Sequence, residues 1–397
     1  PANNIQDLQY FGEFGGVNPS ISDSSTYTFI QAKTMFDTFE GNTDGCYLYS
    51  RHTSPSNNYL GQALAAMEGT EAAQVTASGM GAITPVLLQL CGAGEHIVSS
   101  RTIYGGTYAF LKNFTPRMGI TTTFVDITKL DVVEQAITPT TKVIYCETVS
   151  NPLLEVADIR GLAALAKKYN LKLVVDNTFT PLQISPIKLG ADVVIHSLTK
   201  FINGSSDTVG GVVCGTAEFI NALKSVNDGA CMLLGSTMDS FRSASILKNM
   251  RTLHIRMKQH SHNALYLAEK MEADGLRVVY PGLPSHPSHE IFKTMYNEQY
   301  GFGGMLTIDT GSLENANALM ERMQEENVGY LAVSLGFYKT LFSAPGSSTS
   351  SEIPMDEQLE MGLSDGLIRF SIGLDNDMER TYKTISKCIA ELQLLVQ

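Results

Sequence analysis

The sequence predicts an α/β protein with a mostly parallel sheet, followed by a smaller α+β C-terminal domain. Short apolar runs typical of buried strands alternate with segments of helical periodicity, which is the pattern of a doubly wound sheet. Two neighbouring runs end in polar residues, one at Asp176 and the other just before Lys200. The spacing of 24 positions from Asp176 to Lys200 is about what one strand–helix–strand step needs. Both side chains are therefore expected at the carboxyl edge of the sheet, where such sheets bind ligands.

The elements of the first domain follow in chain order. Residues 59–71 carry apolar side chains at helical spacing (Leu60, Leu64 and Met67), and Gly69 is a helix stop signal near their end. Strands are expected at residues 96–100, 122–126, 142–147, 172–176, 192–197 and 210–214, and helices at residues 82–91 and 159–169. The strand runs are short and apolar, as expected for strands buried in a sheet.

The second domain follows a long helical stretch, residues 239–272, which is expected to link the two domains. Strands are expected around residues 303–308 and 367–372, and a final helix at residues 378–396. We therefore predict an N-terminal arm at residues 1–52, a ligand-binding α/β domain at 53–255 and a C-terminal α+β domain at 256–397.

The N-terminal segment, residues 1–50, is polar and rich in glycine and shows little periodicity. Such a segment cannot bury much of its own surface, so it is either a frayed terminus or an arm that docks on a partner subunit. Tyr49 and Arg51 close this segment, and the planar fork of an arginine suits a phosphate group. A solvated surface arginine is the alternative interpretation.

The composition excludes several classes of function. With 397 residues, 43% hydrophobic and 17% charged, the chain is long enough for two domains and a large core. A net charge of −12 argues against nucleic acid or an anionic membrane as a partner. No apolar run is long enough to span a bilayer, and the first residues lack a signal-peptide pattern. The six cysteines lie far apart, which indicates reduced thiols and a cytoplasmic protein.

The residues around Lys200 match the needs of pyridoxal 5'-phosphate (PLP). This cofactor requires a lysine that bonds to its aldehyde, a carboxylate that keeps its ring nitrogen protonated, and donors that hold its phosphate. Lys200 and Asp176 supply the first two groups. Ser197 and Thr199, which precede the lysine, supply two hydroxyl groups for the phosphate.

A second phosphate-binding candidate is the turn at Ser78, Gly79, Met80 and Gly81, which leads into a helix. Free N–H groups at a helix start bind anions well. A dinucleotide site is a poor interpretation, because the third glycine of G-x-G-x-x-G is replaced by Thr84. A tight turn without a ligand remains open for this segment taken by itself.

Two more residues stand out at strand ends, although neither decides a function. Tyr104 follows a strand, where an aromatic ring could stack on a planar cofactor and its hydroxyl could exchange protons. Arg369 is a charge within an apolar strand, so it needs a partner, which could be a substrate carboxylate or a structural acid. The histidines lack companions at ligand spacing, so no metal site is expected.

Seven blocks of this sequence, in order, resemble the PLP-dependent Cys/Met-metabolism (trans-sulfuration) family, which includes methionine γ-lyase, cystathionine γ-lyase and cystathionine γ-synthase. The resemblance runs from Tyr49 to Arg369. The blocks are Ala77-Ser-Gly-Met-Gly-Ala-Ile, Ile103-Tyr-Gly-Gly-Thr, Glu147-Thr-Val-Ser-Asn151-Pro, Val174-Val-Asp176-Asn-Thr, His196-Ser-Leu-Thr-Lys200-Phe-Ile-Asn-Gly, Ser334-Leu-Gly and Ile368-Arg369-Phe-Ser-Ile-Gly-Leu. It implies PLP-dependent transferase fold type I, which is the aspartate-aminotransferase-like fold, with residues 53–255 as the PLP-binding domain.

The resemblance also implies roles for individual residues. Lys200 would bond PLP and move protons, Asp176 would pair with the ring nitrogen, and Tyr104 would stack on the ring and act as an acid–base group. Asn151 would contact the phenolate side of the cofactor. The amides of Gly79 and Met80, with Ser197 and Thr199, would hold the phosphate.

The remaining implied roles concern the neighbouring subunit and the substrate. Tyr49 and Arg51 would reach the phosphate of the neighbouring subunit, which implies a homodimer with shared active sites, assembled further into a tetramer. Arg369, helped by Ser334, would bind the α-carboxylate of an amino-acid substrate.

The sequence departs from the family pattern mainly near the substrate mouth. Ser54-Pro55-Ser56 replaces the usual Asn-Pro-Thr, and Ser205 replaces a frequent histidine. Lys339 replaces a frequent glutamate, and Thr349-Ser350 replaces a frequent Thr-His pair. Gly106 stands where methionine γ-lyases commonly have a cysteine. We expect Lys339 either to bind a distal carboxylate of the substrate or to point into solvent without effect.

The resemblance implies a carbon–sulfur lyase that eliminates a thiol from methionine, homocysteine or cystathionine and leaves a 2-oxo acid and ammonia. The alternative is γ-replacement on an O-acyl-homoserine, because both reactions share the residues named above. A silent PLP-binding protein is a further alternative, which the retention of Lys200, Asp176, Tyr104 and Arg369 argues against. A nicotinamide dehydrogenase is weaker still, because the dinucleotide motif is incomplete.

Overall fold

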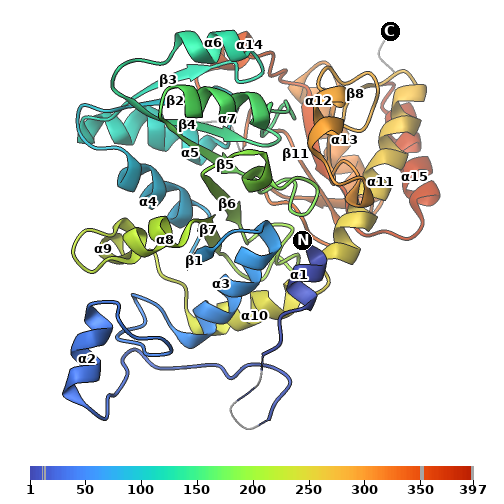
Figure 1. Cartoon of the computed structure of the whole chain (residues 1–397). Helices are drawn as coiled ribbons and strands as arrows, with labels where there is room; N and C mark the ends of the chain where they lie inside the picture. Colours follow the sequence, from blue (N-terminus) through green and yellow to red (C-terminus); the bar gives the residue numbers. More distant parts are fainter. Residues whose placement is uncertain (11, 13–14, 349–352, 395–397) are drawn as a thin grey trace.

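The computed structural model describes residues 1–10, 12, 15–348 and 353–394, and in them the chain forms two separate β-sheets (Figure 1). The larger sheet has seven strands in the order β1-β7-β6-β5-β4-β2-β3 among these residues. Its strands are β1 (Ala72–Thr76), β2 (His96–Ser100), β3 (Thr121–Val125), β4 (Thr141–Glu147), β5 (Lys172–Asp176), β6 (Val193–Ser197) and β7 (Gly211–Gly215). Strands β2 to β6 pair in parallel, whereas β7 runs antiparallel to both β6 and β1.

Helices cover both faces of this sheet, and the strand sequence explains why. Along β5, Leu173 and Val175 pack into one apolar cluster with α3 (Pro55–Glu68) and α7 (Ile159–Lys168), whereas Val174 packs into another with α4 (Met80–Leu90) and α8 (Ala217–Lys224). A strand buried on both faces needs a continuous apolar run rather than an alternating one. The helices of this part are α3 (Pro55–Glu68), α4 (Met80–Leu90), α5 (Gly105–Ala109), α6 (Leu130–Gln135), α7 (Ile159–Lys168), α8 (Ala217–Lys224), α9 (Ala230–Leu234) and α10 (Ser240–Met250).

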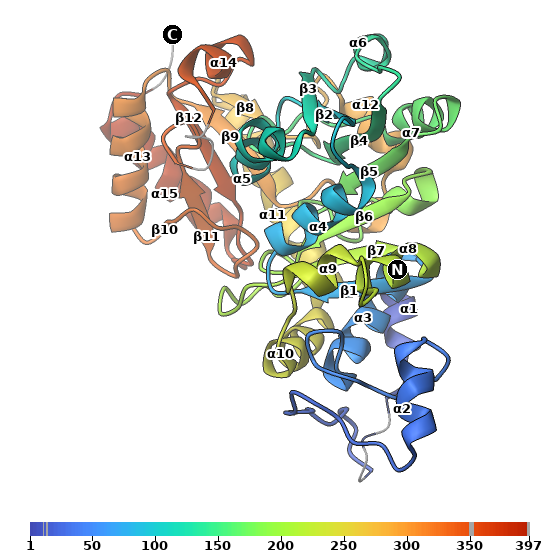
Figure 2. The same ribbon diagram turned by 90° about the vertical axis from the view of Figure 1, so that its left-hand side faces the viewer.

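The second sheet lies beside the first, with α11 (Leu253–Ala273) running between them (Figure 2). It has five strands in the described residues, in the order β10-β11-β12-β9-β8, of which only β10 and β11 pair in parallel. Its strands are β8 (Arg277–Val279), β9 (Met305–Asp309), β10 (Gly329–Leu331), β11 (Thr340–Ser343) and β12 (Leu367–Ser371). The helices that follow α11 are α12 (His289–Met295), α13 (Leu313–Glu325), α14 (Met355–Glu360) and α15 (Met378–Glu391).

The long helical stretch expected at residues 239–272 is two helices, not one. Helix α10 ends at Met250 and α11 begins at Leu253. The carbonyl oxygen of Asn249, in the last turn of α10, accepts hydrogen bonds from the side chains of Thr252 and Arg256. A threonine hydroxyl that bonds to the backbone in this way competes with the helical ladder, and the chain turns here.

The predicted domain boundary at 255/256 falls inside α11 and stays a proposal. Leu253 and Met257, in its first turns, pack into the core of the large sheet, whereas Ala264 and Leu267 pack into the core of the second sheet. Helix α11 therefore joins the two cores. Phe292, on α12, also belongs to the core of the large sheet, so residues beyond 256 contribute to both parts.

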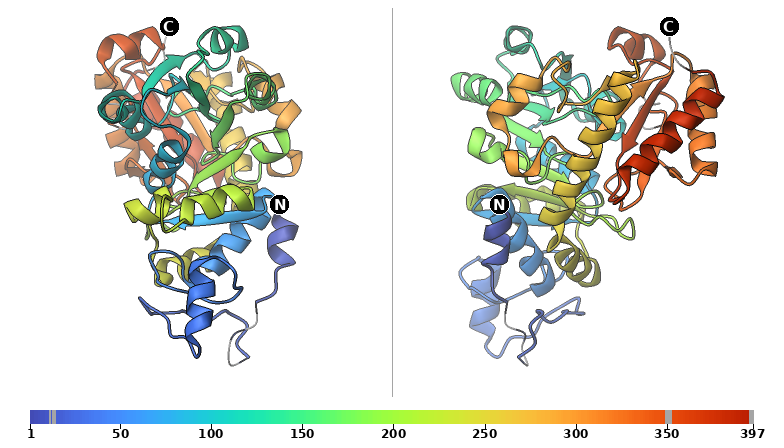
Figure 3. Two further views of the ribbon diagram at one scale, coloured as in Figure 1. Left: turned by 60° about the vertical axis from the view of Figure 1, so that its left-hand side comes forward. Right: turned by 90° about the vertical axis from the view of Figure 1, so that its right-hand side faces the viewer.

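The N-terminal segment extends away from both sheets on the α3 side of the molecule (Figures 1 and 3). It holds two helices that the sequence did not predict, α1 (Ala2–Gln6) and α2 (Ala32–Phe39). Helix α1 packs on α3, where the Asn4 side chain donates to the carbonyl of Ala66 over 3.1 Å. Ile30 and Phe36 are largely exposed to solvent in this chain. The exposed apolar side chains are those expected of an arm that docks on another subunit.

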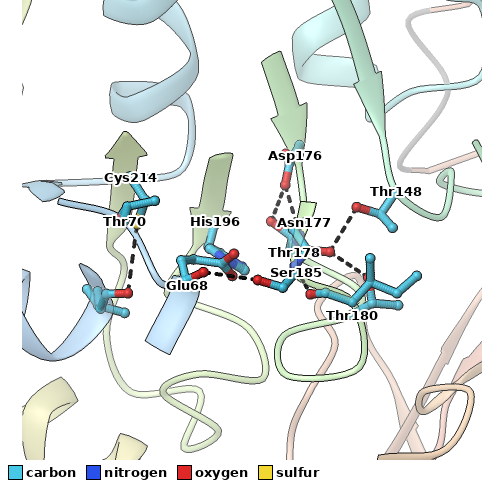
Figure 4. Close-up of polar contacts among 12 residues, drawn as sticks. Glu68, Thr70, Thr148, Asp176, Asn177, Thr178, Thr180, Ser185, His196 and Cys214 are labelled. Atoms are coloured by element: carbon cyan, nitrogen blue, oxygen red, sulfur yellow. Dashed lines mark hydrogen bonds and ion pairs between the residues drawn. The ribbon is translucent and has the colours of Figure 1, made fainter. Parts of the chain in front are cut away.

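Between the end of α3 and strand β6, the side chains of Glu68 and His196 form a buried pair (Figure 4). The Glu68 Oε1 and His196 Nε2 atoms lie 2.7 Å apart, joining the end of α3 to β6. We expect Glu68→Ala to lower the free energy of unfolding by about 1–3 kcal/mol, because it leaves a buried ring nitrogen without a partner. Glu68→Gln keeps an acceptor oxygen and is the matched control. Denaturant unfolding measures both, and equal losses would contradict this account.

Candidate active site

A cleft of about 300 Å³ opens at the carboxyl ends of the parallel strands, where the second sheet approaches the first. It brings together nine of the residues that the sequence predicted for the site. These are Gly79, Met80, Tyr104, Asn151, Asp176, Ser197, Thr199, Lys200 and Arg369. They come from β5, β6 and the turn that follows it, β12, the start of α4 and the loops after β2 and β4.

Lys200 is held in a tight turn just after β6. Its Nζ atom donates to the Oγ atom of Ser334 over 3.1 Å. Ser334 comes this close because Gly336, two residues later, packs against the Lys200 turn, where a Cβ atom would lie 2.4 Å from the Phe201 nitrogen. Burial, helped by the charge of Arg369, lowers the pKa of Lys200 to about 8. The amine is therefore still mostly protonated at neutral pH, but its neutral, nucleophilic form is far more populated than that of an ordinary lysine.

Asp176, at the end of β5, presents one carboxylate oxygen to the cleft. Its Oδ1 atom accepts hydrogen bonds from the backbone N–H (3.0 Å) and the hydroxyl group (2.5 Å) of Thr178 (Figure 4). Its Oδ2 atom accepts none from the part of the chain that the structure describes. Burial raises the pKa of Asp176, and the two bonds from Thr178 oppose that rise. The carboxylate is thus fixed on one side and free for a donor on the other.

Thr178 is a site residue that the sequence analysis missed. Its hydroxyl oxygen accepts from the backbone N–H of Ser197 over 2.8 Å while the hydroxyl donates to Asp176. It therefore locks the end of β5 to the end of β6 and sets the Asp176 carboxylate relative to the Lys200 turn. The Asp-Asn-Thr run contains the signal, because a hydroxyl two residues after an aspartate can bond back to it.

The start of α4 forms a backbone cradle against the end of β6. A Cβ atom on Gly79 would lie 2.9 Å from the Cβ atom of Ser197, so glycine is what lets the two backbones come so close. The helix start points N–H groups and its positive dipole end into the cleft. Thr199 also lines the cleft, but its hydroxyl both donates to and accepts from the backbone of Gly210.

Tyr104 stands at the mouth of the cleft, with about 43% of its surface exposed. Its backbone N–H donates to Glu147 over 2.7 Å. The ring folds over Gly106, where a Cβ atom would lie only 2.6 Å from the Tyr104 Cε1 atom. Any side chain at position 106, including the cysteine of some family members, would therefore have to displace the Tyr104 ring.

Arg369 lies buried in β12 and reaches across from the second sheet. Its guanidinium donates to Asn151 Oδ1 over 2.8 Å and to the carbonyl oxygen of Val333 over 3.2 Å. The buried Nε atom has no partner in the described residues. Burial lowers the pKa of Arg369 to about 10, so the side chain stays charged at neutral pH. A buried cation with an unused N–H group suits a carboxylate ligand.

The cleft of this chain does not include four of the predicted residues. Ser334 is not among the described lining residues, although its hydroxyl group accepts a hydrogen bond from Lys200. Tyr49 and Arg51 are exposed, and the Arg51 guanidinium lies 5.4 Å from the centre of the Tyr49 ring. Lys339 is also outside this lining, and its ammonium group lies 4.8 Å from the centre of the Tyr330 ring.

Two of the departures from the family pattern have structural roles here. Ser54 caps α3 by accepting from the backbone N–H of Asn57 over 3.2 Å, and Ser56 accepts from the N–H of Ser22 over 3.1 Å. Ser205 accepts from the Asn249 side chain over 3.2 Å, at the end of α10. Thr349 and Ser350 lie outside the described residues.

With this geometry in view, comparison with known proteins decides the family. The family model of Cys/Met metabolism PLP-dependent enzymes matches residues 4–380. The chain belongs to this family. A methionine gamma-lyase of Arabidopsis thaliana is 45% identical over 399 residues, covering 99% of this chain and 90% of that protein. An O-succinylhomoserine sulfhydrylase of Pseudomonas aeruginosa is 37% identical, covering 92% of this chain and 88% of that protein.

The fold comparison agrees with the family. The crystal structure of a cystathionine gamma-lyase from Lactobacillus plantarum, complexed with L-serine, superposes with a TM-score of 0.89. The two chains are 30% identical, and the match covers 99% of each. This confirms the fold type I architecture that the sequence predicts. No helix in the described ranges is both long enough and apolar enough to cross a membrane.

The cleft fits the PLP on which this family depends. Gly79 and Met80, at the start of α4, line the cleft together with the buried Lys200 amine and with Asp176, whose Oδ2 atom accepts no hydrogen bond from the described residues. Lys200 would therefore bond the aldehyde carbon, Asp176 would hold the ring nitrogen, and the start of α4 would hold the phosphate. The bound cofactor supplies an electron-withdrawing ring that stabilises negative charge on the substrate carbon.

Proposed function

We propose that this enzyme is a carbon–sulfur lyase that eliminates a thiol from a sulfur-containing amino acid. With methionine and one water molecule, the products would be methanethiol, 2-oxobutanoate and ammonia. The observation that carries the proposal is the pairing of a buried, partly neutral Lys200 with the unpaired Nε atom of Arg369 in one cleft. Arg369 would bind the α-carboxylate, which leaves the Cα proton within the range of Lys200.

The residues of the chain would then divide the work. Lys200 would take the proton from Cα and return it at later steps, because its lowered pKa suits proton transfer near neutral pH. Tyr104, at the mouth, would give a proton to the departing sulfur. Ser334 would hold the Lys200 amine between transfers through their 3.1 Å hydrogen bond. Relatives with methionine and cystathionine gamma-lyase names support this reaction class.

The lining of the cleft favours a substrate with a neutral tail. Apart from Glu147, Asp176, Lys200 and Arg369, the described lining residues carry no charge. Its apolar lining residues include Val149, Phe179, Val209, Val333 and Leu335. A thioether tail fits such a surface better than a remote charged group, whose desolvation would cost free energy. Methionine is therefore the substrate we propose first, and the Lys339 contact with a distal carboxylate stays a prediction.

γ-Replacement on an O-acyl-homoserine is the second candidate, supported by the 37% identity to the Pseudomonas aeruginosa sulfhydrylase. A single assay separates the two. The PLP-loaded enzyme is incubated with methionine, with cystathionine, or with an O-acyl-homoserine plus a thiol. We expect thiol release and a 2-oxo acid in equal amounts from methionine. Consumption of thiol with the acyl-homoserine, without any 2-oxo acid from methionine, would overturn the proposal.

We also propose a homodimer with shared active sites, assembled into a tetramer in the cytoplasm. The exposure of Tyr49 and Arg51 outside the cleft of their own chain supports a role toward a neighbour's phosphate. All six cysteines lie in described residues and are unpaired, which fits a reducing compartment.

Mixed oligomers test the shared site. Arg51→Ala and Lys200→Ala are each expected to be nearly inactive, the first through weaker phosphate binding and the second through loss of the amine. After subunit exchange, hybrids contain some sites with both wild-type residues, so activity well above either parent is expected. Wild-type protein carried through the same exchange is the control. Hybrids that stay as inactive as their parents would show that Arg51 does not act on a neighbour.

A further inference from the structure

Glu147 is a buried carboxylate that lines the cleft. Neither the sequence motifs nor the reaction proposed above assigns a role to it. It ends β4, lines the cleft and keeps only about 7% of its surface exposed. It forms no ion pair with any described residue. Burying a carboxylate costs free energy, so its hydrogen bonds must compensate.

Both oxygens of Glu147 bind backbone groups of site residues. The Oε1 atom accepts from the N–H of Tyr104 over 2.7 Å, and the Oε2 atom accepts from the N–H of Asn151 over 2.8 Å. Tyr104 lies in the loop after β2 and Asn151 in the loop after β4, and these two strands are neighbours in the sheet. Hydrogen bonds to a charged acceptor are about twice as strong as neutral ones. One side chain therefore ties together the two loops that shape this side of the cleft.

Asn151 extends this connection to the second sheet. While its N–H group donates to Glu147, its Oδ1 atom accepts from the Arg369 guanidinium over 2.8 Å. The connected set therefore runs from Tyr104 at the mouth, through Glu147 and Asn151, to the cation proposed to bind the substrate carboxylate. A shift of Glu147 would move both ends of the substrate site at once.

The charge of Glu147 is part of this arrangement. Burial and the nearby Asp176 raise the pKa of Glu147, whereas the two N–H donors and the charge of Arg369 oppose the rise. The N–H donors at its two oxygens stabilise the ionised carboxylate relative to the protonated form, so they act against the rise in its pKa.

We propose that Glu147 is a positioning residue that fixes the Tyr104 loop and, through Asn151, the guanidinium of Arg369 in one arrangement around the cleft. The expected effect of Glu147 on turnover rests on the function proposed above. Its expected effect on the bound cofactor does not. It predicts that removing one acceptor of Glu147 disturbs cofactor geometry and substrate binding together.

The test compares Glu147→Gln with Glu155→Gln. Glutamine keeps the size of Glu147 but turns an NH₂ group toward one of the two N–H donors. Glu155 is also mostly buried and lies in the same β4–α7 loop as Asn151, but its carboxylate faces Thr102 and Arg101, outside the described cleft lining. For Glu147→Gln we expect a higher KM, a lower kcat and about a tenfold to hundredfold loss in kcat/KM. We expect Glu155→Gln to behave like the wild type.

Two readouts do not depend on turnover. The dissociation constant of PLP from each protein, and the visible circular dichroism of the bound PLP, report how the ring is held. We expect Glu147→Gln to weaken PLP binding about tenfold and to change the circular dichroism band, because the loop that carries Tyr104 loses its anchor. If Glu147→Gln does not fold, Glu147→Asp keeps the charge but is too short to reach both donors, so the same shifts are expected.

Wild-type PLP binding, wild-type circular dichroism and an unchanged KM in either folded variant would overturn the proposal. The substrate is whichever amino acid the wild type consumes, so a wrong assignment of methionine leaves this comparison intact.

Discussion

Lys200→Ala is expected to lower kcat by at least about 10³-fold, because it removes both the amine that bonds the cofactor and the group proposed to move protons. PLP should still bind, although more weakly, through the cradle at Gly79 and the carboxylate of Asp176. Its visible spectrum should then be that of the free aldehyde. Steady-state kinetics and absorption spectra of the purified variant measure both effects.

Lys224→Ala is the matched control for this experiment. Lys224, on α8, is also partly buried, and burial lowers its pKa as well, but it lies outside the described lining of the cleft. Turnover of Lys224→Ala should be close to that of the wild type. If Lys200→Ala kept turnover within about tenfold of the wild type, Lys200 would not be the group that carries the chemistry.

Asp176→Asn is expected to lower kcat by roughly 10²–10³-fold while the protein still bonds PLP at Lys200. The amide oxygen can still accept both hydrogen bonds from Thr178, so the loop should keep its shape. The amide NH₂ group then takes the place of the Oδ2 atom. It donates where an acceptor is needed, so the ring nitrogen loses its proton and draws fewer electrons from the substrate.

Asp192→Asn serves as the control for the Asp176 experiment. Asp192 directly precedes β6, and its carboxylate also accepts a hydrogen bond from a backbone N–H group, that of Leu173, over 2.9 Å. This contact lies at the opposite end of β5 from the cleft. A kcat of Asp176→Asn as high as that of Asp192→Asn would show that the ring nitrogen needs no carboxylate partner in this enzyme.

The sequence predicted the central part of the site because strand ends are easy to locate. The apolar runs before Asp176 and Lys200 are the strands β5 and β6, and parallel pairing brings their carboxyl ends to one edge. The same logic placed Tyr104 after β2, whereas Gly79 was placed by the glycine-containing turn that leads into α4, and the structure brings both into the cleft. The predictions from strand ends needed only the order of the strands and the direction in which each one runs.

The contacts that hold the site could not be predicted from such patterns. Glu147 and Thr178 act through hydrogen bonds to the backbone of neighbouring loops, and these depend on the register of β2 against β4 and of β5 against β6. Strand β1 was missed because its sequence, Ala-Ala-Gln-Val-Thr, has few β-branched residues and is defined by its pairing with β7. The break between α10 and α11 depends on the Thr252 and Arg256 side chains meeting one carbonyl group.

Borohydride reduction of the PLP-loaded enzyme, followed by peptide mass mapping, tests the central claim most directly. Reduction makes the bond between PLP and its lysine permanent, so the mapped peptide identifies the residue at the centre of the cleft. We predict a single pyridoxyl group on Lys200, in the peptide that also contains Ser197 and Thr199. A pyridoxyl group on any other lysine, such as Lys224 or Lys339, would contradict the assignment of the active site.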